Sequence, residues 1–164
     1  MFFIKTYYTE RRVITIRQWI TSWGYLPIKF SLDCGDSKGK IQRAFTKNNV
    51  RGDQIRILFS NLHGKDPLHF KCVKIAKTSQ LSNSAPYSFI PLSFNNKQEL
   101  FLKPEECVYS DVIEFKVNEG EFIVIEIHTN NLPSILSGTF FYKDQHITSV
   151  FELSERTQNQ FMQQ

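Results

Sequence analysis

A possible serine nucleophile lies in the tripeptide Gly35-Asp36-Ser37. Ile28, Phe30 and Leu32 alternate ahead of it, so a strand could carry the hydroxyl into a turn. A nucleophilic serine also needs an imidazole base, an acid that orients the base, and donors for the oxyanion. Asp144-Gln145-His146 does not supply a recognisable acid–base block, and Gly-Asp-Ser is also an ordinary turn sequence. Catalysis by Ser37 is therefore kept as an alternative, and the sequence predicts no catalytic residue for this chain.

Metal and cofactor motifs are also missing from the sequence. The histidines show no HxH or HxxxH spacing, and the cysteines form no CxxC pair. There is no P-loop, GxGxxG, GxSxG or HExxH motif. We therefore expect no metal and no cofactor. The residues concerned are His63, His69, His128, His146, Cys34, Cys72 and Cys107.

Cysteine usage and the N-terminal residues bear on the compartment. Three widely spaced cysteines give no disulfide framework, which favours a reducing environment. Lys5 interrupts the apolar start Met1-Phe2-Phe3-Ile4, so a secretory signal is not expected. No apolar run is long enough to span a bilayer as a helix. The prediction is a cytoplasmic chain without a membrane span.

Charge is distributed unevenly along the chain. Residues 1–51 contain ten Lys/Arg and three Asp/Glu, a balance of +7, whereas the remainder contains ten basic and thirteen acidic residues, a balance of −3. A nucleic-acid binder would add a recognition motif to such a basic region, and none is present. The asymmetry is equally consistent with two faces of one domain that meet different neighbours, so nucleic acid is not an expected partner.

The elements that would position these side chains are strands. Apolar residues alternate in 13–17, 54–59 and 122–128, and the phase changes near Cys72-Val73 within 68–76, which suggests a β-bulge. Shorter strands are expected within 40–46, 87–94, 99–102, 112–116, 139–142 and 148–153. Turn-forming residues separate them, and no stretch shows helical spacing. The pattern predicts an all-β, antiparallel, jelly-roll-like β-sandwich over 11–153, after an N-terminal segment 1–10 and before a polar C-terminal tail or linker 154–164.

Several motifs together resemble a known family. Trp19-Ile20-Thr21-Ser22-Trp23 is similar to a W-x-x-[ST]-W opening, and Arg43 falls where that family has a strand ending in Arg. The most specific match is the stretch from Gly52 to Leu68, which resembles G-x-x-[VI]-R-[VIL]-x-[FL]-S-N-x-x-G-x-x-P-L. Read from Trp19 to Val150, the chain resembles the sandwich domain that precedes the catalytic domain in some SGNH (GDSL) esterases.

This resemblance implies a non-catalytic accessory domain that packs on an SGNH catalytic domain, in cis or as a partner protein, and helps to shape its substrate cleft. A stand-alone carbohydrate-binding module is the first alternative, because tryptophan stacks on sugar rings as well as anchoring interfaces. A small serine esterase using Ser37 is the second. The candidates for ligand or interdomain contact are Trp19, Trp23, Arg43, Asn61 and His63.

Overall fold

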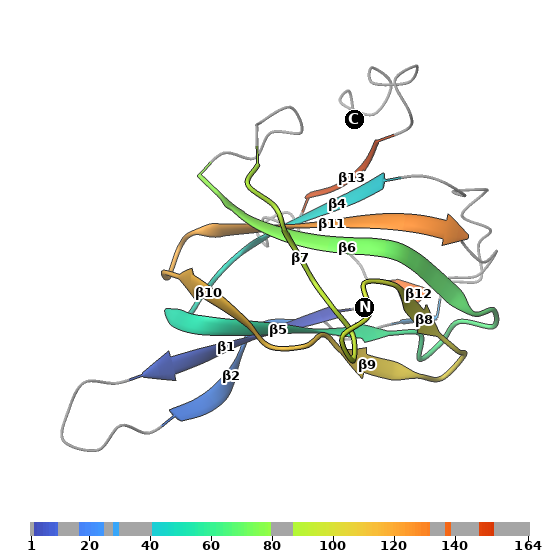
Figure 1. Ribbon diagram of the computed structural model, residues 1–164, viewed down its shortest axis with the longest axis horizontal. Coiled ribbons are helices and arrows are strands. Elements are labelled where there is room, and N and C mark those ends of the chain that lie inside the picture. The colour runs from blue at the N-terminus through green and yellow to red at the C-terminus, as the bar shows by residue number, and fades with distance from the viewer. Residues whose placement is uncertain are drawn as a thin grey trace.

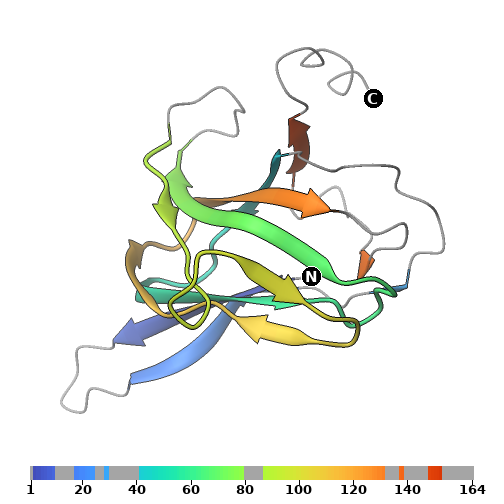
Figure 2. The same ribbon diagram turned by 45° about the vertical axis from the view of Figure 1, so that its right-hand side comes forward.

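The computed structural model describes residues 2–9, 17–24, 28–29, 41–79, 87–131, 137–138 and 148–152. Within these residues every regular element is a strand, and every ladder between strands is antiparallel. Two sheets form separate layers, one above the other in both views (Figures 1 and 2). The prediction of an all-β antiparallel sandwich is confirmed, whereas the jelly-roll connectivity stays a prediction.

The first layer, called the β5 sheet, has the order β10-β5-β1-β2, with β9 also paired to β5. Its strands are β1 (Phe2–Thr9), β2 (Arg17–Trp23), β5 (Gly52–Ser60), β9 (Cys107–Tyr109) and β10 (Ile113–Val117).

The second layer, called the β11 sheet, has the order β13-β4-β11-β6-β7, with β8 also paired to β6. Its strands are β4 (Ile41–Lys47), β6 (Leu68–Thr78), β7 (Ile90–Pro91), β8 (Leu100–Leu102), β11 (Phe122–Asn131) and β13 (Thr148–Glu152). A small separate ladder joins β3 (Ile28–Lys29) to β12 (Ser137–Gly138).

The core lies between the two sheets and follows the alternation in the sequence. On β5, Ile55, Ile57 and Phe59 are buried, while the residues between them are only half-buried. On β11, the inward residues are Ile123 and Ile125, with Ile127 after them. Burying an aliphatic or aromatic side chain of this size stabilises the fold by about 1.5–3 kcal/mol. The two alternating strands predicted from the sequence therefore supply facing walls of one core.

Strand β6 contains the predicted irregularity. Its register against β11 shifts between the His128–Cys72 pair and the Thr129–Phe70 pair, which leaves Lys71 as the extra residue. A bulge of this kind lets one strand change which face its side chains occupy. Phe70 and Val73 both reach the core on either side of it, so the bulge predicted near residue 72 is confirmed.

The sandwich begins earlier in the chain than the sequence pattern suggested. Phe2–Thr9 forms β1, which lies between β5 and β2 and pairs with both. Consecutive Phe2, Phe3 and Ile4 conceal the period of two, so the sequence pattern predicts only an N-terminal segment here and not a strand. Conversely, the strand expected over 87–94 is reduced to β7, and the strand expected over 139–142 lies outside the described residues.

No helix suited by length and hydropathy to cross a bilayer occurs among the residues described.

Candidate functional site

Four ionisable side chains meet on the outer face of the β11 sheet, away from the main core. Arg43 on β4 and Lys74 on β6 are the cross-strand partners of Glu126, which lies between them on β11. His128 follows two residues later on the same face, because side chains alternate along a strand. These residues, Arg43, Lys74, Glu126 and His128, are called the Glu126 cluster.

The carboxylate of Glu126 is the centre of this cluster. Its Oε2 accepts hydrogen bonds from Arg43 Nε at 2.9 Å and forms a 2.8 Å ion pair with Arg43 Nη2. Its Oε1 lies 2.6 Å from His128 Nε2 and 3.5 Å from Lys74 Nζ. The side chain of Glu126 is only 6% exposed. Burial raises the pKa of Glu126, but hydrogen bonds from His128 and Arg43, and the charge of Arg43, outweigh it and lower the pKa overall.

Two aromatic rings hold Arg43 in this position. The guanidinium carbon lies 5.6 Å from the centre of the Tyr87 ring and 5.8 Å from that of Phe89. Both rings also pack on a small apolar cluster formed by Phe45, Val124 and Ala76 on the same outer face. Cation–π contact and the ion pair with Glu126 thus fix the guanidinium together. The cluster is pre-organised and partly shielded from water.

A second group of side chains lies on the outer face of the β5 sheet. The guanidinium of Arg56, on β5, is 4.5 Å from the ring centre of Trp19 and 4.4 Å from that of Tyr109. Arg56 Nε is buried and has no hydrogen-bond acceptor among the described residues. We call these three residues the Arg56 stack. Cationic and aromatic groups arranged in this way are frequent anchors of protein interfaces.

The corner between β5 and β6 is built around Asn61. Its side-chain amide donates to Asp66 O at 2.9 Å and to Leu102 O at 3.3 Å, and its side chain is buried. A Cβ on Gly64 would lie 1.8 Å from Asn61 Oδ1, so only glycine fits there. This explains why a glycine stands three residues after Ser60-Asn61 in the stretch from Gly52 to Leu68. Asn61 therefore holds the corner and is not exposed to a ligand.

An exposed aromatic side chain marks one edge of the β11 sheet. Phe101, on β8, is 62% exposed and stacks on His69 with ring centres 3.8 Å apart and an interplanar angle of 18°. His69 Nε2 lies 3.1 Å from Glu99 Oε2. One face of the Phe101 ring is covered by His69, and a carboxylate lies close to that pair.

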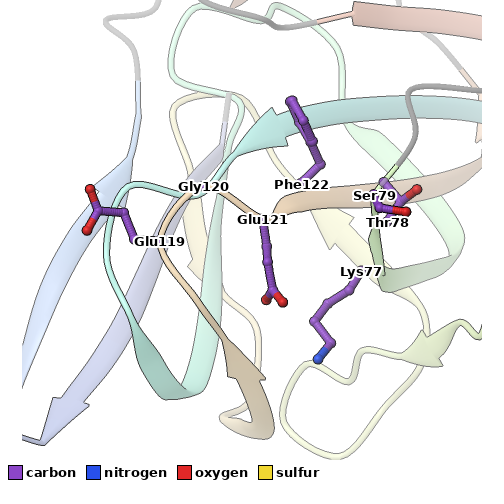
Figure 3. A pocket seen from close by; sticks show the side chains of 7 residues that line it. All are labelled: Lys77, Thr78, Ser79, Glu119, Gly120, Glu121 and Phe122. Carbon is purple, nitrogen blue, oxygen red and sulfur yellow. The ribbon is translucent and has the colours of Figure 1, made fainter.

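A shallow hollow of about 490 Å³ opens where β6 ends and β11 begins (Figure 3). Glu121 lines it, but its carboxylate accepts from the backbone and side-chain amides of Asn118. The hydrogen bond from the Asn118 backbone lowers the pKa of Glu121, and the charge of Lys77 lowers it further. Glu119 points away from these side chains in Figure 3. These groups stabilise the turn before β11, so the hollow does not form the candidate site.

The structure separates the residues that the sequence singled out. Trp19 belongs to the Arg56 stack and Arg43 to the Glu126 cluster, on the outer faces of different sheets. Trp23 ends β2, where its backbone pairs with Ile4, and its side chain lies outside the described part. His63 is half-buried in the corner beside Asn61.

The alternative nucleophile Ser37, in Gly35-Asp36-Ser37, and His146 lie outside the described residues. Cys72 and Cys107 are free thiols, and Cys107 Sγ donates to Ser60 Oγ at 3.1 Å. Within the described ranges, no group of three or more His, Cys, Asp or Glu side chains could hold a metal ion.

Sequence reasoning missed Lys74 and Glu126, and also the pairing of Arg56 with Tyr109. The alternation of apolar residues in 122–128 predicts that Glu126 and His128 lie on the outward face of their strand, and they do lie there. The available signal was the charge at outward positions of two strands that are apolar on their other face. No family model matches this sequence, and no curated protein is detectably similar to it.

Proposed function

We propose that this chain is a non-catalytic accessory β-sandwich that docks on the catalytic domain of an SGNH-type esterase through the Arg56 stack. The resemblance of the stretch from Gly52 to Leu68 motivates the choice of partner. The Arg56 stack motivates the choice of surface, because tryptophan, tyrosine and arginine are the residues most enriched at interface hot spots.

The observation that carries the proposal is the geometry of Arg56. Its guanidinium is held between two rings at 4.4 and 4.5 Å, so little side-chain entropy remains to be lost on binding. The guanidinium has five donors. Nε is buried, but the side chain as a whole is half-buried, so part of the guanidinium stays accessible to a partner. A partner that brings a carboxylate or carbonyl oxygen to this face would satisfy donors that are already in place.

A binding experiment tests the docking surface directly. The purified chain is titrated with a separately produced SGNH catalytic domain encoded in the same genome, using calorimetry. We expect a saturable complex and at least about tenfold weaker binding by Arg56→Ala, the loss typical of a hot-spot residue. Trp19→Phe is a milder second variant, and Lys71→Ala, at an exposed position of β6 in the other sheet, is the matched control. Equal affinity of Arg56→Ala and wild type would overturn the proposed surface.

A hydrolysis assay tests the non-catalytic part of the proposal. The chain alone is incubated with p-nitrophenyl acetate beside the chain carrying Ser37→Ala. We expect neither protein to hydrolyse the ester faster than buffer alone. Turnover by the wild type that disappears in Ser37→Ala would replace the proposal with the serine esterase alternative.

Carbohydrate binding is the second candidate function, and Phe101 favours it. A flat, 62% exposed ring beside the Glu99 carboxylate combines a stacking surface with a hydroxyl acceptor, the two groups that sugars require. A glycan array is probed with wild type and Phe101→Ala. Glycan binding that is lost in Phe101→Ala but retained in Arg56→Ala would support this function. The absence of binding to any glycan on the array would contradict it.

A further inference from the structure

The Glu126 cluster contains more positive charge than its one carboxylate neutralises. Arg43 and Glu126 pair closely and cancel each other, with both side chains largely buried, at 14% and 6% exposed. Lys74 is left with its ammonium 3.5 Å from Oε1, longer than an ordinary N–H···O hydrogen bond. Among the described side chains of this cluster, the net charge is therefore +1 with His128 neutral and +2 with His128 protonated.

The surplus charge is on the accessible side of the cluster. The side chains of Lys74 and His128 are 33% and 28% exposed, so solutes can reach them. Each makes its described side-chain contact with the same oxygen, Glu126 Oε1. Lysine carries three donors and histidine two ring nitrogens, so both can bind a further group.

The rest of the cluster is rigid. Arg43 is fixed by Glu126 on one side and by the rings of Tyr87 and Phe89 on the other. Cys72 is the cross-strand partner of His128 in the β6–β11 ladder. A new anion would meet the Lys74 ammonium and the His128 ring without having to break the Arg43–Glu126 pair.

We propose that Lys74 and His128 form a binding site for an oxyanion group, a phosphate, sulfate or carboxylate, on the outer face of the β11 sheet. The ammonium of Lys74 would turn from its long contact with Glu126 toward the anion, and the imidazole of His128 would supply the second contact. Hydrogen bonds between charged partners are roughly twice as strong as neutral ones, which favours an anion over a neutral ligand. This site is independent of the proposed docking surface on the other sheet.

Titration with simple anions tests the site. Sodium phosphate, sodium sulfate and sodium acetate are each added to the full chain at constant ionic strength maintained with sodium chloride, while the NMR signals of the His128 ring are followed. We expect a saturable shift with at least one of them. Lys74→Met, which keeps the aliphatic stem, should weaken that binding by about tenfold or more, because it removes a charged hydrogen bond. Comparison of the three anions identifies the preferred group.

Two controls make the result decisive. Lys116→Met, on the exposed side of β10 in the other sheet, removes an equal charge and should leave the affinity unchanged. His128→Gln retains a hydrogen-bonding side chain without a positive charge and should bind less tightly than wild type. A shift that does not saturate for any of the anions, or that weakens equally in Lys74→Met and Lys116→Met, would overturn the proposal. Thermal unfolding of each variant verifies that it is folded.

Discussion

Neutralising Glu126 is the most direct test of the ion network on the β11 sheet. In Glu126→Gln the carboxamide has nearly the same shape as the carboxylate, so the change removes charge and leaves packing intact. Arg43, which is 14% exposed, would then lie in its buried position without a counter-ion. His128 and Lys74 would lose the same acceptor charge, although both are more exposed.

The size of the effect follows from how deeply these groups are buried. Removing one partner of a fully buried ion pair costs about 3–5 kcal/mol, because it leaves an unpaired charge. The amide oxygen can still accept one hydrogen bond from Arg43, and water reaches Lys74 and His128, which reduces the loss. We expect the free energy of unfolding of Glu126→Gln to fall by about 2–3 kcal/mol at pH 7.

Urea unfolding followed by circular dichroism measures this difference, provided that the slope with denaturant is unchanged. Glu114→Gln is the matched control, because Glu114 is exposed on β10 and hydrogen-bonds Gln54. It should alter stability by less than about 0.5 kcal/mol. If Glu126→Gln also changes the free energy of unfolding by less than about 0.5 kcal/mol, the ion network makes no net contribution to stability and the prediction is wrong. A double-mutant cycle with Arg43→Met then measures the coupling directly.

The pH dependence gives an independent signature. The pKa of Glu126 is lowered in the folded state, so its ionised form contributes stability that is fully present above the ordinary value of 4.5. That contribution is lost as the pH falls through the lower, folded-state pKa. The stability difference between wild type and Glu126→Gln should therefore narrow below pH 4.5, and a difference that stays constant would contradict the assigned shift.

Three further predictions concern the corner and a turn. Gly64→Ala should lower the free energy of unfolding by about 2–4 kcal/mol in urea titrations, since the new Cβ would displace the buried Asn61 amide. Asn61→Ala should lower the free energy of unfolding by a similar amount. The double variant should lose much less than the sum of the two single losses, because both changes remove the same hydrogen bonds. Additive losses would contradict the contact between Asn61 and Gly64. Asp111 accepts from Ser93 Oγ at 2.6 Å and Asn96 N at 2.8 Å, and these bonds lower its pKa. The stability that ionised Asp111 contributes is present above its ordinary pKa of 3.8 and is lost as the pH falls below it. The free energy of unfolding of Asp111→Ala should therefore fall less steeply with acidification than that of wild type. Identical pH profiles of the two proteins would refute the lowered pKa.

The local pattern of the sequence predicted the strands because it is a property of each segment alone. Ile55 and Ile57 alternate with Gln54 and Arg56, and Ile125 and Ile127 alternate with Glu126 and His128, so the inward face of each strand could be read directly from the sequence. The bulge near Cys72 was readable for the same reason, as a break in that alternation. Strand β1 was not predicted, because its first residues are consecutively apolar and show no alternation.

Tertiary structure alone decided the sites. Alternation placed Glu126 on the outward face, but it could not predict that Arg43, Lys74 and His128 gather around its carboxylate there, with the side chain only 6% exposed. Arg43 and Glu126 are 83 residues apart, and their contact depends on β4 pairing with β11. Which strands pair is a non-local property of the whole chain. A single sequence therefore determines which side chains face outward, and only the fold determines which of them meet.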